Sequence, residues 1–568
     1  MRLVSVCLAG LLGAALLSPA RAAGGEGPSV AGATEPQYLT FQVFTAGPGM
    51  TTEPGGHVLS RLPEPGFLDA EARKLLGFVG ERGDGRHRLG IMAGPLALDY
   101  TDAQMRQLIE RTFVLASKYK IAVGLHIDDA KFWMNRRDLW SNPANVEWLD
   151  WKGTPNTGQY LNWGEPWKLA PQVCFNSAQM LKEARRVAGE VIGPAIAKEL
   201  AKLRANGEAS LFAGVIVGWE TAIGRDFDTR RDLGYCALTN LGFSEKAPPA
   251  DPGRVLDGVV QRWIETWSQS LAAAGVPSDR IYSHIAFKSR KRFEAAHGSD
   301  DASYARSVMY SPPSVAFGKS HRPGFSTYPD PDTLNETYAA LAAHGSPPWA
   351  SAEGANVDME TGPPHIPDET MENYLARMFN HGATLINVFG WDIPGPPNPF
   401  RQAAESAEAV AAYRKFLRGE TLQETPLAQL AREDPSSLAA RVRALPARIA
   451  SYQRAGGDLS AIQPRVKRLE EAVRDGRNAA IEEALDQIDV MLEEGVSGPS
   501  SASGGVDVAA LQQQMRALPR KLADFQERGG DMERVRSRVE SIQTLIASGQ
   551  LKQAAEELRA LEPILRSP

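Results

Sequence analysis

The sequence predicts a (β/α)8 barrel over residues 36–420, followed by an all-α tail of two helical repeats. Two observations support the barrel: strand-like apolar runs alternate with amphipathic helical stretches, and this alternation continues for about 380 residues. A change in composition near residue 420 supports the tail, because the sequence beyond it is almost entirely helix-forming. A doubly wound parallel sheet shares the same local pattern and is the alternative fold.

Eight runs are predicted to be strands, and the fourth is apolar on both faces, as a strand between a barrel interior and outer helices must be. In chain order they cover residues 38–46, 88–93, 121–125, 211–218, 281–287, 324–328, 349–352 and 383–389. Thr101, with Gln104 three residues later, forms a capping-box signal for the helix after the second strand. Further helices are expected at residues 177–206, 254–274, 332–344, 368–381 and 401–417.

The first 22 residues are predicted to be a signal peptide. Arg2 precedes a short apolar run at residues 3–17, and Ala20-Arg21-Ala22 has the small-x-small pattern of a cleavage site. The run is short for a bilayer span, so a membrane anchor is the weaker alternative. We therefore expect a secreted or periplasmic protein without a membrane span.

The tail contains an internal repeat at an offset of 73 residues. Residues 443–446 (RALP) recur at 516–519, and residues 456–458 (GGD) recur at 529–531. The predicted units are helical repeat 1 at 434–494, a Gly/Ser-rich linker at 495–507, and helical repeat 2 at 508–566. Neither copy has a cluster of catalytic residue types, so we expect the tail to dock to a cell-surface or partner protein, or to act as a spacer.

Composition and motifs exclude several classes of function. With 62 Lys and Arg against 68 Asp and Glu, the chain lacks the positive charge typical of nucleic-acid binding. It has no CxxC pair, HExxH motif, Walker loop or GxGxxG loop, so no metal and no cofactor is expected. Cys174 and Cys236 are the cysteines beyond the signal peptide, and whether they pair is left open.

Two glutamates directly follow predicted strands. Glu220 follows the fourth and Glu353 follows the seventh, and the active site of such a barrel lies at the C-terminal ends of its strands. A carboxylate there is costly unless it is paired, solvated or functional. Retaining glycosidases need two carboxylates about 5 to 5.5 Å apart, one as acid/base and one as nucleophile. The alternative is that either glutamate forms a salt bridge to a neighbouring loop.

The order of these motifs resembles the clan-A retaining glycoside hydrolases over roughly residues 38–420. The resemblance implies that Glu220 is the acid/base and Glu353 the nucleophile. It also implies that Tyr328 contacts the nucleophile and that Trp391, in the Phe389-Gly390-Trp391 run, lies under the sugar. The sequence departs from the clan where Trp219 replaces the Asn that usually precedes the acid/base and binds the sugar 2-OH. Asn387 and His126 are candidate substitutes for that Asn.

The remaining candidates for substrate binding come from the strand ends and from a tryptophan-rich segment. His284 lies on the fifth strand, and Asp128 follows the third, with Asp129 beside it as the alternative carboxylate pair. Six tryptophans lie between residues 133 and 167, so this segment is expected to form a long loop over a carbohydrate substrate. Of these, Trp133 and Trp163, together with Trp219, are predicted to contact sugar; the alternative is that they pack the loop itself.

Three charged residues follow Glu220 on the next loop: Arg225, Asp226 and Asp228. They are interpreted as a solvated loop, with substrate binding as the alternative. Taken together, the sequence predicts a glycoside hydrolase acting on a poly- or oligosaccharide. A different class of function, a non-catalytic carbohydrate-binding barrel, would be indicated by a separation well over 6 Å between the carboxyl oxygens of Glu220 and Glu353.

Overall fold

The structure is a computed structural model. It describes residues 35–45, 51–52, 58–59, 62–161, 167–229, 231–289, 311–357, 369–391, 399–425, 462–474, 478–494 and 551–566, with single positions between 441 and 459 and between 518 and 545. The predicted signal peptide, the predicted linker and Trp163 lie outside these residues.

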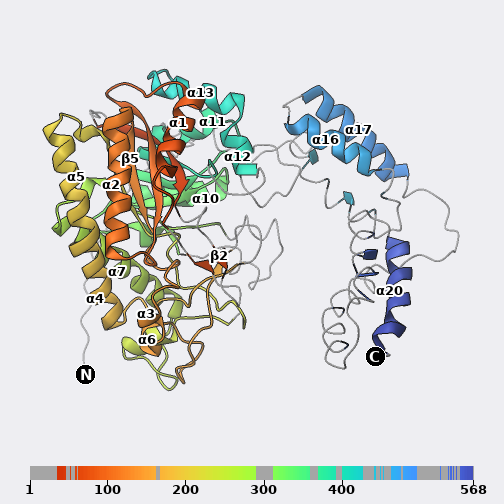
Figure 1. The fold of residues 1–568 in the computed structure, drawn as a ribbon, viewed down its shortest axis with the longest axis horizontal. Helices are drawn as coiled ribbons and strands as arrows, with labels where there is room; N and C mark the ends of the chain where they lie inside the picture. The colour runs from red at the N-terminus through yellow and green to blue at the C-terminus, as the bar shows by residue number, and fades with distance from the viewer. Residues whose placement is uncertain are drawn as a thin grey trace, which may run out of the picture. The chain divides into compact units, whose positions relative to one another are not determined.

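Eight parallel strands form the barrel (Figure 1). Their order in the sheet is β10-β11-β12-β1-β4-β5-β8-β9, and parallel bridges Tyr282–Arg322 and Ile285–Phe325 join β9 to β10. The strands are β1 (Gln37–Phe44), β4 (His87–Leu96), β5 (Ala122–Ile127), β8 (Phe212–Val217), β9 (Ile281–Ser283), β10 (Gly324–Thr327), β11 (Trp349–Gly354) and β12 (Ala383–Val388). Because the sheet closes on itself, the predicted barrel is confirmed and the open doubly wound sheet is excluded.

Helices on the outside of the sheet connect the strands (Figure 1). They are α1 (Phe67–Val79), α2 (Asp102–Tyr119), α3 (Arg137–Trp140), α4 (Ala178–Arg186), α5 (Gly193–Ala205), α6 (Tyr235–Asn240), α7 (Pro252–Ala273), α10 (Pro331–Ala343), α11 (Met371–Asn380), α12 (Pro399–Ala404) and α13 (Ala407–Leu417). Two short hairpin-like pairs lie in loops: β2 (Thr51–Thr52) with β3 (Val58–Leu59), and β6 (Tyr160–Leu161) with β7 (Trp167–Lys168).

Side-chain caps fix where several helices begin. The predicted capping box of α2 is present, since the Thr101 side chain accepts from the Gln104 N–H and the Gln104 side chain accepts from the Thr101 N–H. Asp251 caps α7 and Asp330 caps α10 in the same way, each followed by a proline in the first turn. These caps satisfy N–H groups in the first turn of each helix that have no partner within the helix.

Side chains along each strand point alternately outward to the helices and inward to the barrel interior, and some of the inward positions are polar. Leu39, Phe41 and Val43 of β1 point outward into the layer between strands and helices. A smaller apolar layer inside the barrel consists of Tyr38, Met92, Ala122, Ala213, Ile216, Tyr282, Ala350, Ala352 and Leu385. Since side chains alternate along a strand, the even positions of β1, including Gln42, face inward with Tyr38.

The structure differs from the sequence prediction at two elements. The predicted strand 281–287 has regular pairing only at Ile281–Ser283, because the carbonyl of His284 accepts from the N–H of Thr221 in the neighbouring loop. The predicted helix 401–417 is two helices, because Ser406 interrupts it and its side chain caps α13 at the Ala409 N–H. The long helix predicted at 177–206 is present as α4, a π-helical segment and α5 in continuous succession.

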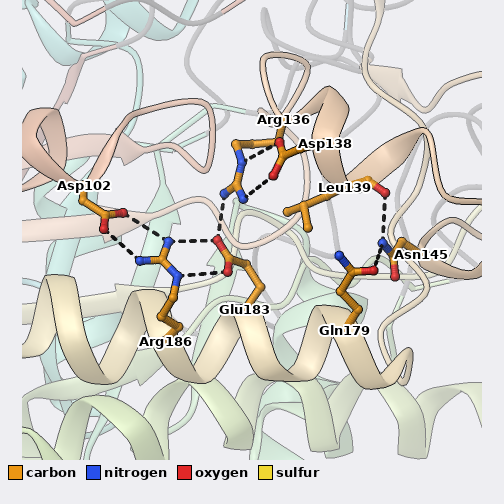
Figure 2. Close-up of polar contacts among 8 residues, drawn as sticks. All are labelled: Asp102, Arg136, Asp138, Leu139, Asn145, Gln179, Glu183 and Arg186. Carbon is orange, nitrogen blue, oxygen red and sulfur yellow. Dashed lines mark hydrogen bonds and ion pairs between the residues drawn. The ribbon is translucent and has the colours of Figure 1, made fainter.

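The long loop after β5 is attached to the helix layer by charged and amide side chains (Figure 2). Arg136 pairs with Glu183 of α4 at 2.8 Å, and Arg186 pairs with both Glu183 and Asp102 at the start of α2. Farther along the loop, Asn145 donates to Gln179 Oε1 and to the Leu139 carbonyl, both at 2.9 Å. The loop is therefore fixed to the scaffold at two places.

Two separate apolar clusters lie beyond residue 425. One contains α16 (Gln463–Arg474) and α17 (Asn478–Glu494), and the other contains α20 (Leu551–Arg566). Buried or partly buried positions recur in both at the offset seen in the sequence, including Leu445 with Leu518, Tyr452 with Phe525, Ile462 with Val535, Leu469 with Ile542, and Leu485 with Leu558. The division into two helical repeats stays a prediction.

Of the helices that the structure describes, none is both long enough and apolar enough to cross a lipid bilayer.

Candidate active site

The two predicted carboxylates meet at the C-terminal ends of the barrel strands. A carboxylate oxygen of Glu220, one of Glu353 and a ring nitrogen of His284 all lie within 4.8 Å of one another. This spacing fits the short separation of a retaining pair of carboxylates, because an inverting pair stands about 6.5 to 9.5 Å apart. It gives no support to a carbohydrate-binding barrel with widely separated carboxylates.

A strained turn after β8 directs Glu220 toward the site. Gly218 has a φ of +102° and Glu220 a φ of +55°, a left-handed conformation that is uncommon for glutamate. The turn is held on both sides: Gly218 N–H donates to the Ile127 carbonyl of β5, and Thr221 N–H donates to the carbonyl of His284, just after β9. Such strain persists only where the surroundings impose it, and it is frequent at active sites.

Glu353, on β11, is buried with 3% of its surface exposed. The Tyr328 hydroxyl donates to its Oε1 at 2.6 Å, as the resemblance to clan A implied. Burial, followed by the negative charge of Glu220, raises the pKa of Glu353 to about 8, while the Tyr328 hydrogen bond and Lys131 oppose this rise. Two carboxylates this close repel each other when both are ionised.

Lys131 supplies the positive charge of the site and was not predicted from the sequence. Its ammonium lies 3.5 Å from Oε2 of Glu220, and its side chain is 2% exposed. The predicted residue Asp128 positions it, because the buried Asp128 carboxylate accepts from the N–H groups of Lys131 at 2.9 Å and Phe132 at 2.6 Å. An aspartate capping its own turn could have suggested that the residue three positions later is held in place.

Asp129 supports the same turn from the other side. Its carboxylate accepts from the Thr221 hydroxyl at 2.9 and 3.0 Å and from the Trp263 indole N–H at 2.9 Å. Burial, followed by the charge of Asp128, raises the pKa of Asp129 to about 7. The alternative pair Asp128 and Asp129 is therefore occupied in holding the loops next to Glu220.

A chain of hydrogen bonds runs through the barrel interior to Glu220. The Gln42 side-chain NH2 lies 3.2 to 3.4 Å from three main-chain carbonyls, those of Val43, Met92 and Gly94, so its Oε1 must accept. That oxygen accepts from Asn387 Nδ2 at 2.8 Å and from His126 Nδ1 at 2.9 Å. His126 Nε2 also lies 2.9 Å from the Gly218 carbonyl oxygen, so an acceptor faces each ring nitrogen of His126.

The same chain continues from His126 through His284 to Ser326. Burial lowers the pKa of His126 to about 3 and that of His284 well below its usual value, so both rings are neutral. His126 Nε2 lies 3.0 Å from His284 Nδ1. His284 Nε2 lies 2.8 Å from the Ser326 hydroxyl oxygen, and the Ser326 hydroxyl donates to Glu220 Oε1 at 3.4 Å.

The structure places the other predicted substrate-binding residues in the walls and core of the barrel. Trp219 is buried and stacks on His126 with ring centroids 4.1 Å apart. Asn387 is buried, and its amide donates to the Ala352 carbonyl as well as to Gln42. In these positions Trp219 and Asn387 shape the chain of hydrogen bonds, and sugar contacts by either side chain stay a prediction.

Two further tryptophans occupy packed positions. Trp391 packs in the layer between barrel and helices. Its ring centroid lies 5.4 Å from that of Phe41 and 5.0 Å from that of Phe78, and the Lys74 ammonium lies over its ring. Trp133 is fully buried, and its indole N–H donates to the Pro171 carbonyl at 2.9 Å. A contact with sugar would require either side chain to leave this packing.

The loops after β5 and β8 are joined by the charged residues that follow Glu220. Asp226 accepts from the Thr157 N–H at 2.7 Å, and Asp228 accepts from the Thr157 hydroxyl at 2.6 Å. Arg225 pairs with Asp232 within its own loop. The two aspartates are therefore bound to protein groups and join the tryptophan-rich loop to the loop that carries Glu220.

A cavity of about 390 Å³ lies within the tryptophan-rich loop. It is lined by Met134, Trp140, Ser141, Pro143, Val146, Pro155, Asn156, Thr157 and Pro171. Neither Glu220 nor Glu353 lines it, so this cavity is separate from the carboxylate pair.

Glu220, His284 and Glu353 also have the spacing of a metal-ligand set. Both ring nitrogens of His284 already have hydrogen-bond partners, His126 and Ser326, so a metal would have to displace one of them. The hydrogen-bond donors and acceptors around Glu220, His284 and Glu353 are of the kind that acid–base catalysis uses.

No protein-family model and no curated protein matches the sequence. Among solved structures, the catalytic domain of a β-amylase from Paenibacillus polymyxa matches with a TM-score of 0.40 and 9% identity, over 66% of this chain and 99% of that chain. An α-amylase from Malbranchea cinnamomea matches with a TM-score of 0.27 and 8% identity, over 75% of this chain and 78% of that chain.

Proposed function

We propose that the protein is an exported glycoside hydrolase that cleaves a poly- or oligosaccharide with retention of anomeric configuration. The observation that carries this proposal is the pair Glu220 and Glu353, with carboxylate oxygens within 4.8 Å at the C-terminal ends of two barrel strands. The predicted signal peptide motivates the export.

Glu353 acts as the nucleophile in this proposal. Its carboxylate attacks the anomeric carbon as the glycosidic C–O bond breaks, which forms a glycosyl ester on the enzyme. The Tyr328 hydroxyl, 2.6 Å from Oε1, orients the carboxylate and favours its ionised form. This bond opposes the effect of burial, but the pKa of Glu353 remains raised to about 8, so the carboxyl must lose a proton before it attacks.

Glu220 acts as the acid/base. The Ser326 hydroxyl donates to Glu220 Oε1 at 3.4 Å and orients the carboxyl group. Glu220 gives a proton to the leaving oxygen, and the Lys131 ammonium, 3.5 Å away, stabilises the carboxylate that results. The Glu220 carboxylate then takes a proton from the water that hydrolyses the ester.

The test is a polysaccharide and oligosaccharide panel with wild type, Glu353→Gln and Glu336→Gln, an exposed residue of α10 that serves as the matched control. We expect wild type and Glu336→Gln to release sugar whose first product has the anomeric configuration of the substrate, and Glu353→Gln to release none. Full activity of Glu353→Gln on a confirmed substrate, or inversion of configuration by wild type, would refute the mechanism.

The tail belongs to the proposal as a separate function. Its apolar clusters are self-contained around residues 442–492 and 518–561. We propose that these units dock the enzyme to a cell-surface or partner protein and take no part in the chemistry. Binding of the isolated tail to cells that express the protein, compared with the barrel alone, tests this role.

A further inference from the structure

Two thiols meet in a buried cluster that the proposed chemistry does not use. Cys174 lies just before α4 and Cys236 lies on α6, and both are buried. The side-chain amide of Asn240 donates to Cys174 Sγ at 3.3 Å and to Cys236 Sγ at 3.8 Å. One NH2 group therefore contacts both sulfurs, which places the two thiols side by side although 62 positions separate them in the sequence (236 − 174).

The surroundings of Cys174 favour a neutral sulfur. Burial, followed by a hydrogen bond to the Cys236 thiol and the charge of Glu147, raises the pKa of Cys174. Glu147 is itself fully buried beside the thiols, and burial raises its pKa to about 7. A thiolate is thus strongly disfavoured at this place, whereas a disulfide carries no charge to desolvate.

A metal site does not account for the cluster. Among the described residues, the His, Cys, Asp and Glu group with mutual ligand distances suitable for a metal is the one at Glu220, and the group of Cys174, Cys236 and Glu147 is not. A nucleophilic role is equally unsuited, because a reactive thiol needs exposure and a lowered pKa. Two adjacent thiols in a chain with a predicted signal peptide match a structural disulfide.

We propose that Cys174 and Cys236 form a disulfide bond that fastens the end of the tryptophan-rich loop to the loop after β8. Two S–H bonds break and one S–S bond forms, with release of two protons and two electrons. The oxidant is a second disulfide, which takes up the two electrons and two protons by thiol–disulfide exchange and becomes two thiols. Since both sulfurs are buried in the folded chain, this exchange occurs while the chain is folding.

The bond would matter because it joins the two loops that carry the charged groups of the site. The loop after β5 carries Lys131, and the loop after β8 carries Glu220. Their present connections are hydrogen bonds such as Asp226 to Thr157 and Cys236 N–H to Glu147. A covalent link restricts the unfolded chain and so adds stability to this pair of loops.

Peptide mapping of the full chain tests the bond directly. Trypsin releases Cys174 in peptide 169–182 and Cys236 in peptide 232–246, so Cys7 does not interfere. From protein folded in an oxidising buffer and alkylated under denaturing conditions, we expect one linked pair of these peptides, which separates on reduction. In the Cys174→Ser variant the peptide 232–246 should carry the alkyl group. Recovery of both wild-type peptides separately, each alkylated, would overturn the proposal.

A thermal melt tests the consequence of the bond. Reductant should lower the melting temperature of wild type by several degrees and leave that of the Cys174→Ser, Cys236→Ser double variant unchanged. Equal responses of the two proteins to reductant would overturn the claim that the link fastens the loops. Neither measurement uses substrate, so both outcomes are independent of the proposed hydrolase activity.

Discussion

The hydroxyl of Tyr328 donates a 2.6 Å hydrogen bond to Oε1 of Glu353, and it opposes the rise in the pKa of that carboxyl caused by burial. Tyr328→Phe removes the donor without changing the shape of the ring. We expect the pKa of Glu353 to rise further, so the acidic limb of the kcat/KM profile should move to higher pH, with kcat reduced about 10- to 100-fold. An acidic limb at the same pH as in wild type would show that Tyr328 does not affect the pKa of Glu353.

Glu220→Ala removes the proposed proton donor and opens space beside the anomeric carbon. Activity on natural substrates should fall by about 10² to 10⁴, the usual contribution of general acid–base catalysis. On substrates with an activated leaving group, azide should restore turnover and yield a glycosyl azide of retained configuration. Azide should not rescue Glu353→Gln, which is the control. A glycosyl azide of inverted configuration from the Glu220 variant would reverse the two roles.

Glu353→Gln should increase stability in a pH-dependent way. The pKa of Glu353 is about 8 in the folded protein, against 4.5 for an unperturbed glutamate. Between these values the folded state binds more protons than the unfolded state, so wild type loses stability as pH rises from about 4.5 to 8. Glu353→Gln does not lose stability in this way. Its free energy of unfolding relative to wild type should therefore increase from pH 5 to pH 8 by up to a few kcal/mol, since one pKa unit corresponds to about 1.4 kcal/mol. Denaturant unfolding at three pH values measures it.

The matched control for this experiment is Glu336→Gln, which changes an exposed glutamate of α10. Its difference in stability from wild type should be small and equal at all three pH values. An advantage of Glu353→Gln that shrinks as pH rises would contradict a raised pKa at this position.

Gly218→Ala should damage the turn that directs Glu220. The φ of Gly218 is +102°, and a Cβ there would lie 2.5 Å from the Thr221 hydroxyl oxygen. We expect a loss of roughly 1 to 3 kcal/mol in stability and a larger relative loss in kcat. Gly224→Ala, in the same loop, is the control, because its Cβ would meet no atom within 4 Å. Melting temperatures and kcat values of the two variants make the comparison, and equal behaviour would show that the turn tolerates a side chain.

A chain that ends at Thr425 should keep the barrel folded and active on small substrates. Residues 424–425 belong to the barrel, because Thr425 bonds to Asn373 and Arg377 of α11, while Glu424 bonds to His381. The cores of the tail begin only beyond them. Circular dichroism and kcat on a soluble oligosaccharide check the result. A fall in kcat at full folding would make the tail part of the catalytic unit.

Much of the barrel could be predicted because its signals are local. Each of the eight predicted strands is present, since a buried parallel strand is a short apolar run regardless of its neighbours. The strand at 281–287 was predicted too long because its irregularity comes from a bond between His284 and Thr221, which are distant in sequence. The break at Ser406 was missed although serine is a common N-cap.

The carboxylates of the site could be found from their position after strands, but their partners could not. Lys131 lies in a loop, and its contact with Glu220 depends on the turn that Asp128 caps. Gln42 and Ser326 look like ordinary strand residues, and their role follows only from the direction of hydrogen bonds across the barrel. Such relationships form between strands far apart in the chain, so no spacing in the sequence marks them.

The bridges that close the barrel between β9 and β10 form its shortest region of strand pairing. His284 follows β9 and Ser326 lies on β10, so their 2.8 Å bond crosses this seam. Local opening there costs less than global unfolding, and it would cut the path from Gln42 to Glu220 before any helix is lost. Opening of this seam would separate His284 from Ser326, which is the side chain that donates to Glu220.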